Sequence, residues 1–189
     1  MGGAKFLAPL INEIDSKLYD LIVHPLSGIF IESFFQNKKF ELIDIEKNKI
    51  EDFWQIKTSN YSSVITTTSS KIIDQTNAKL IKVFRDNSIP TLGFLDHWKG
   101  FDRFFDDYNQ PSYMPDWLGV IDQKTKTRLE SINSESKKIF VVGQPWLDFL
   151  KQRKNKESES EGDKSILLVS QPDQMNKFAS IFCENDNQN

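Results

Sequence analysis

The segment "SSVITTTSSKIIDQTNAKLIKVFRDNSIPTLGFLDH", residues 62–97, decides the fold class of this chain. A run rich in β-branched residues (62–70) comes first, and a second apolar run (89–97) closes the segment. Between them, the apolar residues of 74–87 recur with a period near 3.6, which is typical of an amphipathic helix. This succession predicts a strand, a helix and a second strand, the βαβ unit of parallel sheets.

The same alternation continues on both sides of this segment. Further strands are predicted from apolar runs at 19–25, 39–45, 117–122 and 137–145. Further helices are predicted at 4–18, 27–38, 49–58, 123–133 and 146–154. Because the apolar runs are nearly continuous, the strands are expected to be buried on both faces. The chain is therefore predicted to be an α/β protein with a Rossmann-like, mostly parallel sheet and helices on both faces.

The composition excludes several functional classes. The 189 residues are 38% hydrophobic, which is enough for a packed core, and their net charge is -3 without a basic stripe. This argues against a nucleic-acid partner. The single cysteine, Cys183, allows no intrachain disulfide, and no Cys/His spacing suits a metal, so neither a metal nor a cofactor is expected. Without a signal peptide or membrane-spanning run, a cytoplasmic location is predicted.

The domain organisation is read from composition. Residues 1–150 are predicted to form one Rossmann-like domain, followed by a charged linker at 151–164. Residues 165–189 predict one strand and one helix, which cannot bury a core, and they are expected to open a truncated second domain. At the other end, the glycines lead into a helix with no strand before them, although a Rossmann-like half normally begins with one. Both ends suggest a piece of a larger protein.

Candidate site residues gather where predicted strands end, because open α/β sheets bind ligands at the carboxyl ends of their strands. Asp96 could act as a base, while His97 and Arg103 could contact a substrate or phosphate. The alternative is a structural histidine and a surface ion pair of Arg103 with a nearby aspartate. The remaining candidates for ligand contacts are Gly2, Gly3, Thr67, Thr68, Ser69 and Gln144.

Each of these remaining candidates also has a structural explanation. The backbone N–H groups of Gly2 and Gly3 could bind an anion, or the pair could serve only as a turn. Hydroxyls of the run 66–70 could hold sugar or phosphate oxygens, or Ser69 or Ser70 could cap the next helix. Gln144 could contact a ligand or cap neighbouring backbone. The sequence contains no GxSxG elbow and no Walker-type loop, which disfavours a nucleophilic hydrolase.

The order of the segments resembles the N-terminal half of GT-B-type proteins. The likeness rests on "GGAKFLAPLI", "VITTTSS", "IPTLGFLDHW", "MPDWLGVIDQKTKTRL", "KIFVVGQPWLD" and "ILLVSQP". The chain is similar to UDP-N-acetylglucosamine 2-epimerase-like proteins and to related surface-polysaccharide glycosyltransferase-like proteins. Asp96 stands where these epimerases keep an acidic residue in a strand-end segment. That segment reads "DHWKGFDRF" here, whereas the family has an "EAGLR" type. The threonine run stands where the epimerases have a "GDT"-like turn, and the aspartate of that turn is absent here. The departures favour a transferase-like or undefined relative over a true epimerase.

The resemblance implies a function and partners. The substrate would be a nucleotide sugar or a glycan acceptor in polysaccharide biosynthesis, and this half would form the acceptor-side wall of the cleft. Because GT-B proteins bind the sugar nucleotide mainly through their C-terminal domain, the chain is expected to need a separate C-terminal domain chain, or a homo-oligomer, for catalysis. The alternative is a non-catalytic Rossmann-like module that binds a partner.

Overall fold

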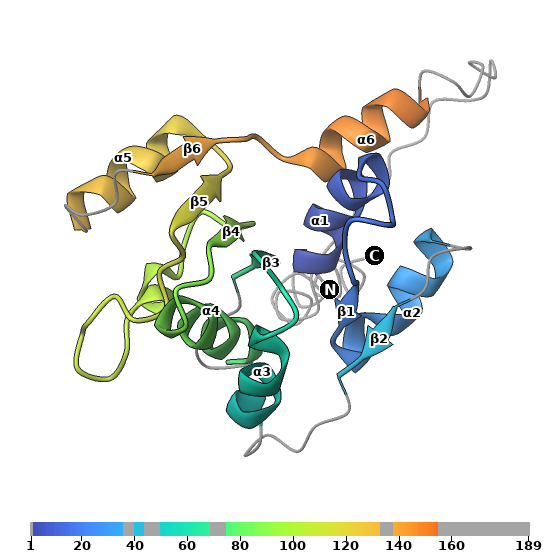
Figure 1. Cartoon of the computed structure of the whole chain (residues 1–189). Coiled ribbons are helices and arrows are strands. Elements are labelled where there is room, and N and C mark those ends of the chain that lie inside the picture. The colour runs from blue at the N-terminus through green and yellow to red at the C-terminus, as the bar shows by residue number, and fades with distance from the viewer. Residues whose placement is uncertain (1, 36–39, 44–49, 69–74, 133–137, 155–189) are drawn as a thin grey trace, which may run out of the picture. The chain divides into compact units, whose positions relative to one another are not determined.

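A computed structural model describes residues 2–35, 40–43, 50–68, 75–132 and 138–154. The chain divides into two compact units, residues 1–156 and 157–189, and all described residues belong to the first. Helices and strands alternate along this unit (Figure 1). The helices are α1 (Gly2–Glu13), α2 (Pro25–Phe34), α3 (Ile50–Thr58), α4 (Thr76–Asp86), α5 (Gln123–Ile132) and α6 (Pro145–Lys154). The strands are β1 (Ile22–Val23), β2 (Glu41–Leu42), β3 (Val64–Thr67), β4 (Thr91–Leu95), β5 (Trp117–Val120) and β6 (Ile139–Val141).

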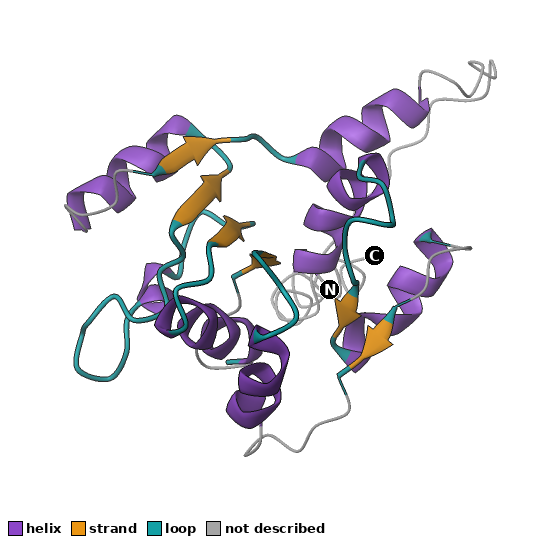
Figure 2. Ribbon diagram, in the orientation of Figure 1, coloured by secondary structure: helices purple, strands orange, loops and turns teal. Residues whose placement is uncertain are grey.

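The described strands form two parallel sheets (Figure 2). The smaller sheet pairs β1 with β2, and the larger has the order β3-β4-β5-β6. In the larger sheet Val64 lies beside Thr91, and Leu92 lies beside Trp117. Every pairing is parallel, so the predicted α/β class with a parallel sheet is confirmed at this level.

One face of the larger sheet is covered by α4 and α5. Val64 of β3 packs against a buried cluster that includes Ile81 and Phe84 of α4, each 1% exposed. Leu118 of β5 and Leu129 of α5 belong to a second buried cluster on the same face. These helices present apolar residues at helical spacing, and burying that stripe is what fixes them to the sheet.

The opposite face is covered mainly at one end, by α1. The ring of Phe6 lies 5.5 Å from that of Phe94 in β4, and both residues are buried. Farther along the sheet, Phe140 remains 50% exposed, and on β3 Ile65 is 51% exposed. The expectation that the strands are buried on both faces is therefore wrong for these residues, because about half of each side chain remains open to solvent.

Two boundaries differ from the sequence predictions. The glycines do not precede the first helix as a turn, because Gly2 and Gly3 form part of the first turn of α1. The predicted linker begins too early, since α6 continues to Lys154. Its last residues, Lys151 to Lys154, favour helix by intrinsic propensity. The predicted strand and helix of 165–189 lie outside the described residues.

No helix within the described ranges is long and apolar enough to cross a membrane.

Candidate functional site

Three neighbouring strands end at the same edge of the larger sheet. The chain leaves β3 at Thr68, β4 at Asp96 and β5 at Ile121-Asp122. Because the strands are parallel and in register, their carboxyl ends meet at this edge. The edge therefore collects a hydroxyl and two carboxylates from segments far apart in the sequence. Ligands of open α/β sheets bind at such an edge.

Arg103 crosses from the segment after β4 to the end of β3. It lies in the short 3-10 helix η2 (Phe101–Phe104), anchored by buried Phe101 and Phe104. Its Nη1 donates hydrogen bonds to the backbone oxygen of Thr68 at 2.9 Å and to the Oγ1 of Thr68 at 3.2 Å. Its Nε donates to the backbone oxygen of Gly100 at 2.8 Å. The guanidinium thus fastens two strand ends together.

A glycine is required where this segment turns. Gly100 has a φ of +78°, in the left-handed region that side-chain-bearing residues disfavour. A Cβ at this position would also lie 3.0 Å from an Arg103 guanidinium nitrogen. The positive φ of Gly100 thus lets the chain turn back so that Arg103 reaches Thr68.

Asp96 lies next to Arg103 at the strand end. The Arg103 Nη1 is 3.8 Å from the Asp96 Oδ1, and the two side chains are only 11% and 19% exposed. Burial lowers the pKa of the Arg103 guanidinium, and the charge of Asp96 opposes that shift. Arginine nevertheless stays protonated at any physiological pH. The pair therefore presents a fixed positive charge beside a carboxylate that solvent still reaches.

Trp98 and Asp122 form a second contact at this edge. The Trp98 Nε1 donates to the Asp122 Oδ2 at 2.9 Å, while the indole stays 54% exposed. The Asp122 Oδ1 accepts from the backbone N–H of Thr125 at 2.7 Å, so Asp122 caps the start of α5. The Thr125 and Trp98 hydrogen bonds lower the pKa of the Asp122 carboxyl. The carboxylate is therefore ionised at neutral pH.

His97 makes its described contacts outside this cluster. It is exposed, and its Nδ1 accepts a hydrogen bond from the backbone N–H of Lys99 at 3.1 Å. Its ring meets that of Trp98 edge-on, with the centroids 6.2 Å apart. The described contacts of His97 are thus local, and none joins it to Asp96 or Arg103.

The remaining predicted residues divide between packing and the sheet edge. Thr67 is buried, accepts a hydrogen bond from the Asn77 Nδ2 at 3.3 Å, and lies against Gly3. Gln144 follows β6 at the start of α6, and its buried Oε1 has no hydrogen-bond partner among the described residues. Ser69 lies outside the described residues. The structure brings Thr68, Asp96 and Arg103 together and places Gly3 beside the neighbouring Thr67, whereas no described contact joins His97 to Asp96 or Arg103.

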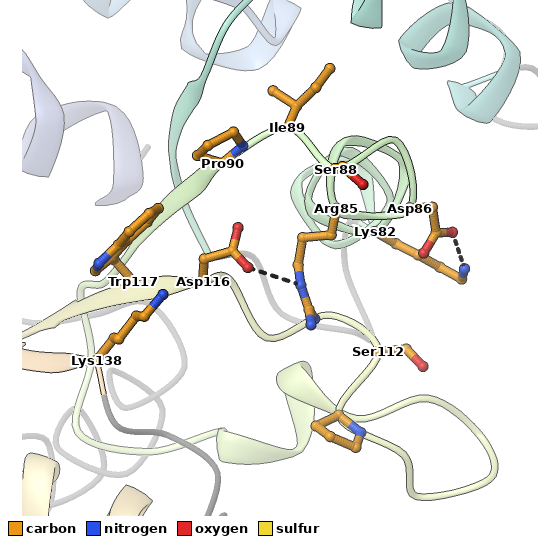
Figure 3. Close-up of a pocket in the computed structure, with 11 residues that line it drawn as sticks. Lys82, Arg85, Asp86, Ser88, Ile89, Pro90, Ser112, Asp116, Trp117 and Lys138 are labelled. Atoms are coloured by element: carbon orange, nitrogen blue, oxygen red, sulfur yellow. Dashed lines mark hydrogen bonds and ion pairs between the residues drawn. The ribbon is translucent and has the colours of Figure 1, made fainter.

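An open groove, of about 560 Å³, lies at the opposite, amino edge of the same sheet (Figure 3). Here Asp116 accepts hydrogen bonds from the backbone N–H and hydroxyl of Thr91, at 2.8 and 2.9 Å. Arg85 pairs with the same aspartate at 3.5 Å and donates to the backbone oxygen of Met114 at 2.6 Å. These contacts tie the starts of β4 and β5 to α4. The carboxyl edge, not this groove, is therefore the candidate site.

Sequence reasoning missed two aspartates. Asp122 had a recognisable signal, since an aspartate between a strand and a helix is a favoured N-cap. Asp116 precedes β5 in "MPDWLGV", and only the structure shows that it holds Thr91. Across the described ranges, no three or more His, Cys, Asp or Glu residues are arranged to hold a metal ion.

Comparison with protein-family models, with curated proteins and with solved structures found no match for this chain.

Proposed function

We propose that residues 2–154 act as the N-terminal, acceptor-side domain of a GT-B-type enzyme that uses nucleotide sugars to build a polysaccharide or another glycan. The observation that carries the proposal is the meeting of Thr68, Asp96 and Arg103 at the carboxyl ends of β3 and β4. This edge is where open α/β sheets bind ligands. The proposal also draws on the order of the sequence segments, which resembles that of GT-B proteins.

The chemistry of the edge suits a sugar. A carboxylate such as that of Asp96 can accept a hydrogen bond from a sugar hydroxyl and take its proton as the hydroxyl attacks. Arg103 places a positive charge beside it, which would favour a phosphate. The exposed indole of Trp98 offers an apolar surface to a sugar ring. In this role Asp96 is the catalytic residue, while Arg103 and Trp98 bind.

The second candidate is a non-catalytic module in which the same contacts only hold the fold. This candidate is favoured by the hydrogen bonds of Arg103, because its Nη1 and Nε both donate to oxygens of the protein itself. In that case Asp96 would serve to neutralise a buried guanidinium. The two candidates differ in what happens when the charge of Asp96 is removed.

Calorimetry of the whole chain with UDP-, CDP- and GDP-sugars and short glycans tests the proposal. The titrations are repeated in the presence of any C-terminal partner chain. One of these ligands is expected to bind, and Asp96→Asn is expected to weaken that binding about tenfold, or about 1.4 kcal/mol. The matched control is Asp102→Asn, which removes an exposed carboxylate from the neighbouring η2.

Two outcomes would reject parts of this proposal. If no ligand gives heat in either setting, the chain is not half of a nucleotide-sugar enzyme. If a ligand binds but Asp96→Asn and Asp102→Asn behave alike, Asp96 is not part of the site. Circular dichroism of both variants shows whether the fold is kept, which separates lost binding from unfolding.

A further inference from the structure

Among the described strands, β1 and β3 each pair on one side only, as do β2 and β6 at the other edges of the two sheets. In the smaller sheet, the backbone oxygens of Leu21 and Val23 accept from β2, so the backbone groups of Ile22 point the other way. In the larger sheet, the N–H groups of Val64 and Thr68 donate towards β4. Backbone groups alternate along a strand, so those of Ile65 and Thr67 point away from β4.

The unpaired edges of β1 and β3 share the elements that cover them. On one face, Val23 of β1 packs with Ala8 of α1. The same helix contacts β3 through Gly3, where an added Cβ would lie 2.2 Å from the Thr67 Oγ1. A single helix thus spans from one sheet to the other.

The opposite face is shared in the same way. Ile22 of β1 and Val64 of β3 both pack against one cluster that includes Trp54 of α3 and Phe84 of α4. The interval between β1 and β3 is therefore covered by α1 on one side and by this cluster on the other. Such an interval is apolar on both faces.

A hydrogen bond also joins the amino ends of the two strands. The Tyr61 hydroxyl, just before β3, donates to the Asp20 Oδ2, just before β1, at 2.9 Å. Burial and this aspartate raise the pKa of Tyr61 to about 12, so the phenol remains a donor at neutral pH. If one strand were inserted between them, β1 and β3 would lie about 9.6 Å apart, which is twice the usual strand spacing. The side chains of Tyr61 and Asp20 can bridge that distance end to end.

We propose that the interval between β1 and β3 is an interaction surface that receives one extended, uncharged, β-branched segment of a partner polypeptide, as a strand parallel to both. The segment would join the two sheets into one continuous parallel sheet. Its backbone would pair with Ile22 on one side and with Ile65 and Thr67 on the other. Because both faces of the interval are covered by apolar side chains, a charged segment would be excluded.

The partner segment can be supplied in a defined direction. A strand parallel to β3 ends at the carboxyl edge of the sheet, where α1 begins beside Thr67. A five-residue Val/Ile extension placed ahead of Met1 through a short glycine linker is therefore aimed into the interval. The matched control extension replaces its second and fourth residues with aspartate. Both are made on the whole 189-residue chain.

Amide hydrogen exchange is the measurement. With the Val/Ile extension, exchange at Ile65 and Thr67 is expected to slow at least tenfold relative to the aspartate control. Exchange at Thr66, whose N–H faces β4, is expected to stay unchanged. The thermal midpoint is expected to rise with the Val/Ile extension only. A separate Val/Ile peptide with lysines at both ends, added to the unextended chain, is expected to give the same pattern of protection.

The proposal is overturned if neither the extension nor the peptide slows exchange at Ile65 and Thr67. It is also overturned if these amides are already protected in a dimer of the unextended chain, detected by ultracentrifugation, because the occupant would then be a second copy. Slowed exchange confined to β6 would place the segment on the exposed sheet face around Phe140 instead. None of these outcomes depends on sugar binding.

Discussion

Gly3 occupies a position at which the absence of a side chain is needed for packing. A Cβ there would lie 2.2 Å from the Oγ1 and 2.9 Å from the Cβ of Thr67, closer than any real contact allows. Thr67 is buried and belongs to β3, so it cannot move aside. The glycine therefore lets α1 approach the sheet.

We expect Gly3→Ala to destabilise the chain by about 1–3 kcal/mol, the usual cost of overpacking. The measurement is urea unfolding followed by circular dichroism. Gly28→Ala in α2 is the control, because the nearest atom there is a Cδ of half-exposed Leu42 at 3.3 Å. That change should be neutral or stabilising, since alanine favours helix over glycine. Equal effects of the two substitutions would contradict the close packing of α1 on β3.

Asp122 couples the stability of the carboxyl edge to pH. Its folded pKa lies below the ordinary 3.8, so the stabilisation is fully present above that pH and is lost as the pH falls through the lower folded value. Asp122→Asn is therefore expected to lower the thermal midpoint at pH 7 and to match the wild type increasingly below pH 3.8. Glu130→Gln, an exposed change in the same helix, should show no such convergence. A difference between Asp122→Asn and wild type that stays constant with pH would contradict the assignment.

At the scale of elements, α4 fixes β3 and β4 to the rest of the chain. Its buried residues Leu80, Ile81 and Phe84 follow helical spacing and join one cluster with Trp54 of α3. The helix therefore carries much of the hydrophobic stabilisation of this sheet. The short strands β1 and β2, of two residues each, depend on such packing more than on their own pairing.

Phe84→Ala is expected to cost about 3–5 kcal/mol, because the ring is 1% exposed and leaves a cavity. The control is Ile56→Ala in α3, whose side chain is 73% exposed and should change stability by no more than about 0.5 kcal/mol. Urea unfolding measures both variants. Similar losses for both would mean that α4 does not form the core described.

At the scale of the whole unit, one sheet face carries exposed apolar side chains. Ile65, Phe140 and Val142 are between 40% and 51% exposed, and Val141 is itself 46% exposed, whereas Ile139, just before Phe140, is only 4% exposed. Neighbours in sequence therefore face different surroundings, because side chains on a strand alternate between faces. Exposed patches of this kind promote association.

Ile139→Ser and Phe140→Ser test this alternation. Ile139 is 4% exposed, so its replacement is expected to cost about 3 kcal/mol, whereas replacing half-exposed Phe140 should cost about 1 kcal/mol or less. Phe140→Ser should also reduce any self-association seen by ultracentrifugation. A larger loss at Phe140 than at Ile139 would mean that the faces of β6 are assigned the wrong way round.

The sequence by itself determined the fold class and the order of the elements. The six strands and six helices predicted within residues 1–154 occur at or near the expected positions, whereas the strand and helix predicted in 165–189 lie outside the described residues. This succeeded because hydrophobic periodicity is a local property, with a period of 3.6 for helices and short continuous runs for buried strands. The sequence also placed Asp96 and Arg103 near a strand end, since parallel strands share one direction.

Only the tertiary structure decided which residues meet. Arg103 bonds to Thr68, 35 residues earlier in the chain, and Trp98 bonds to Asp122, 24 residues later. The division into two sheets and the exposed side of β6 are likewise non-local, because they depend on which strand edges and faces other elements reach. Local patterns predict which segments form strands and helices, whereas the site, and the interval between β1 and β3, arise from contacts between segments distant in sequence.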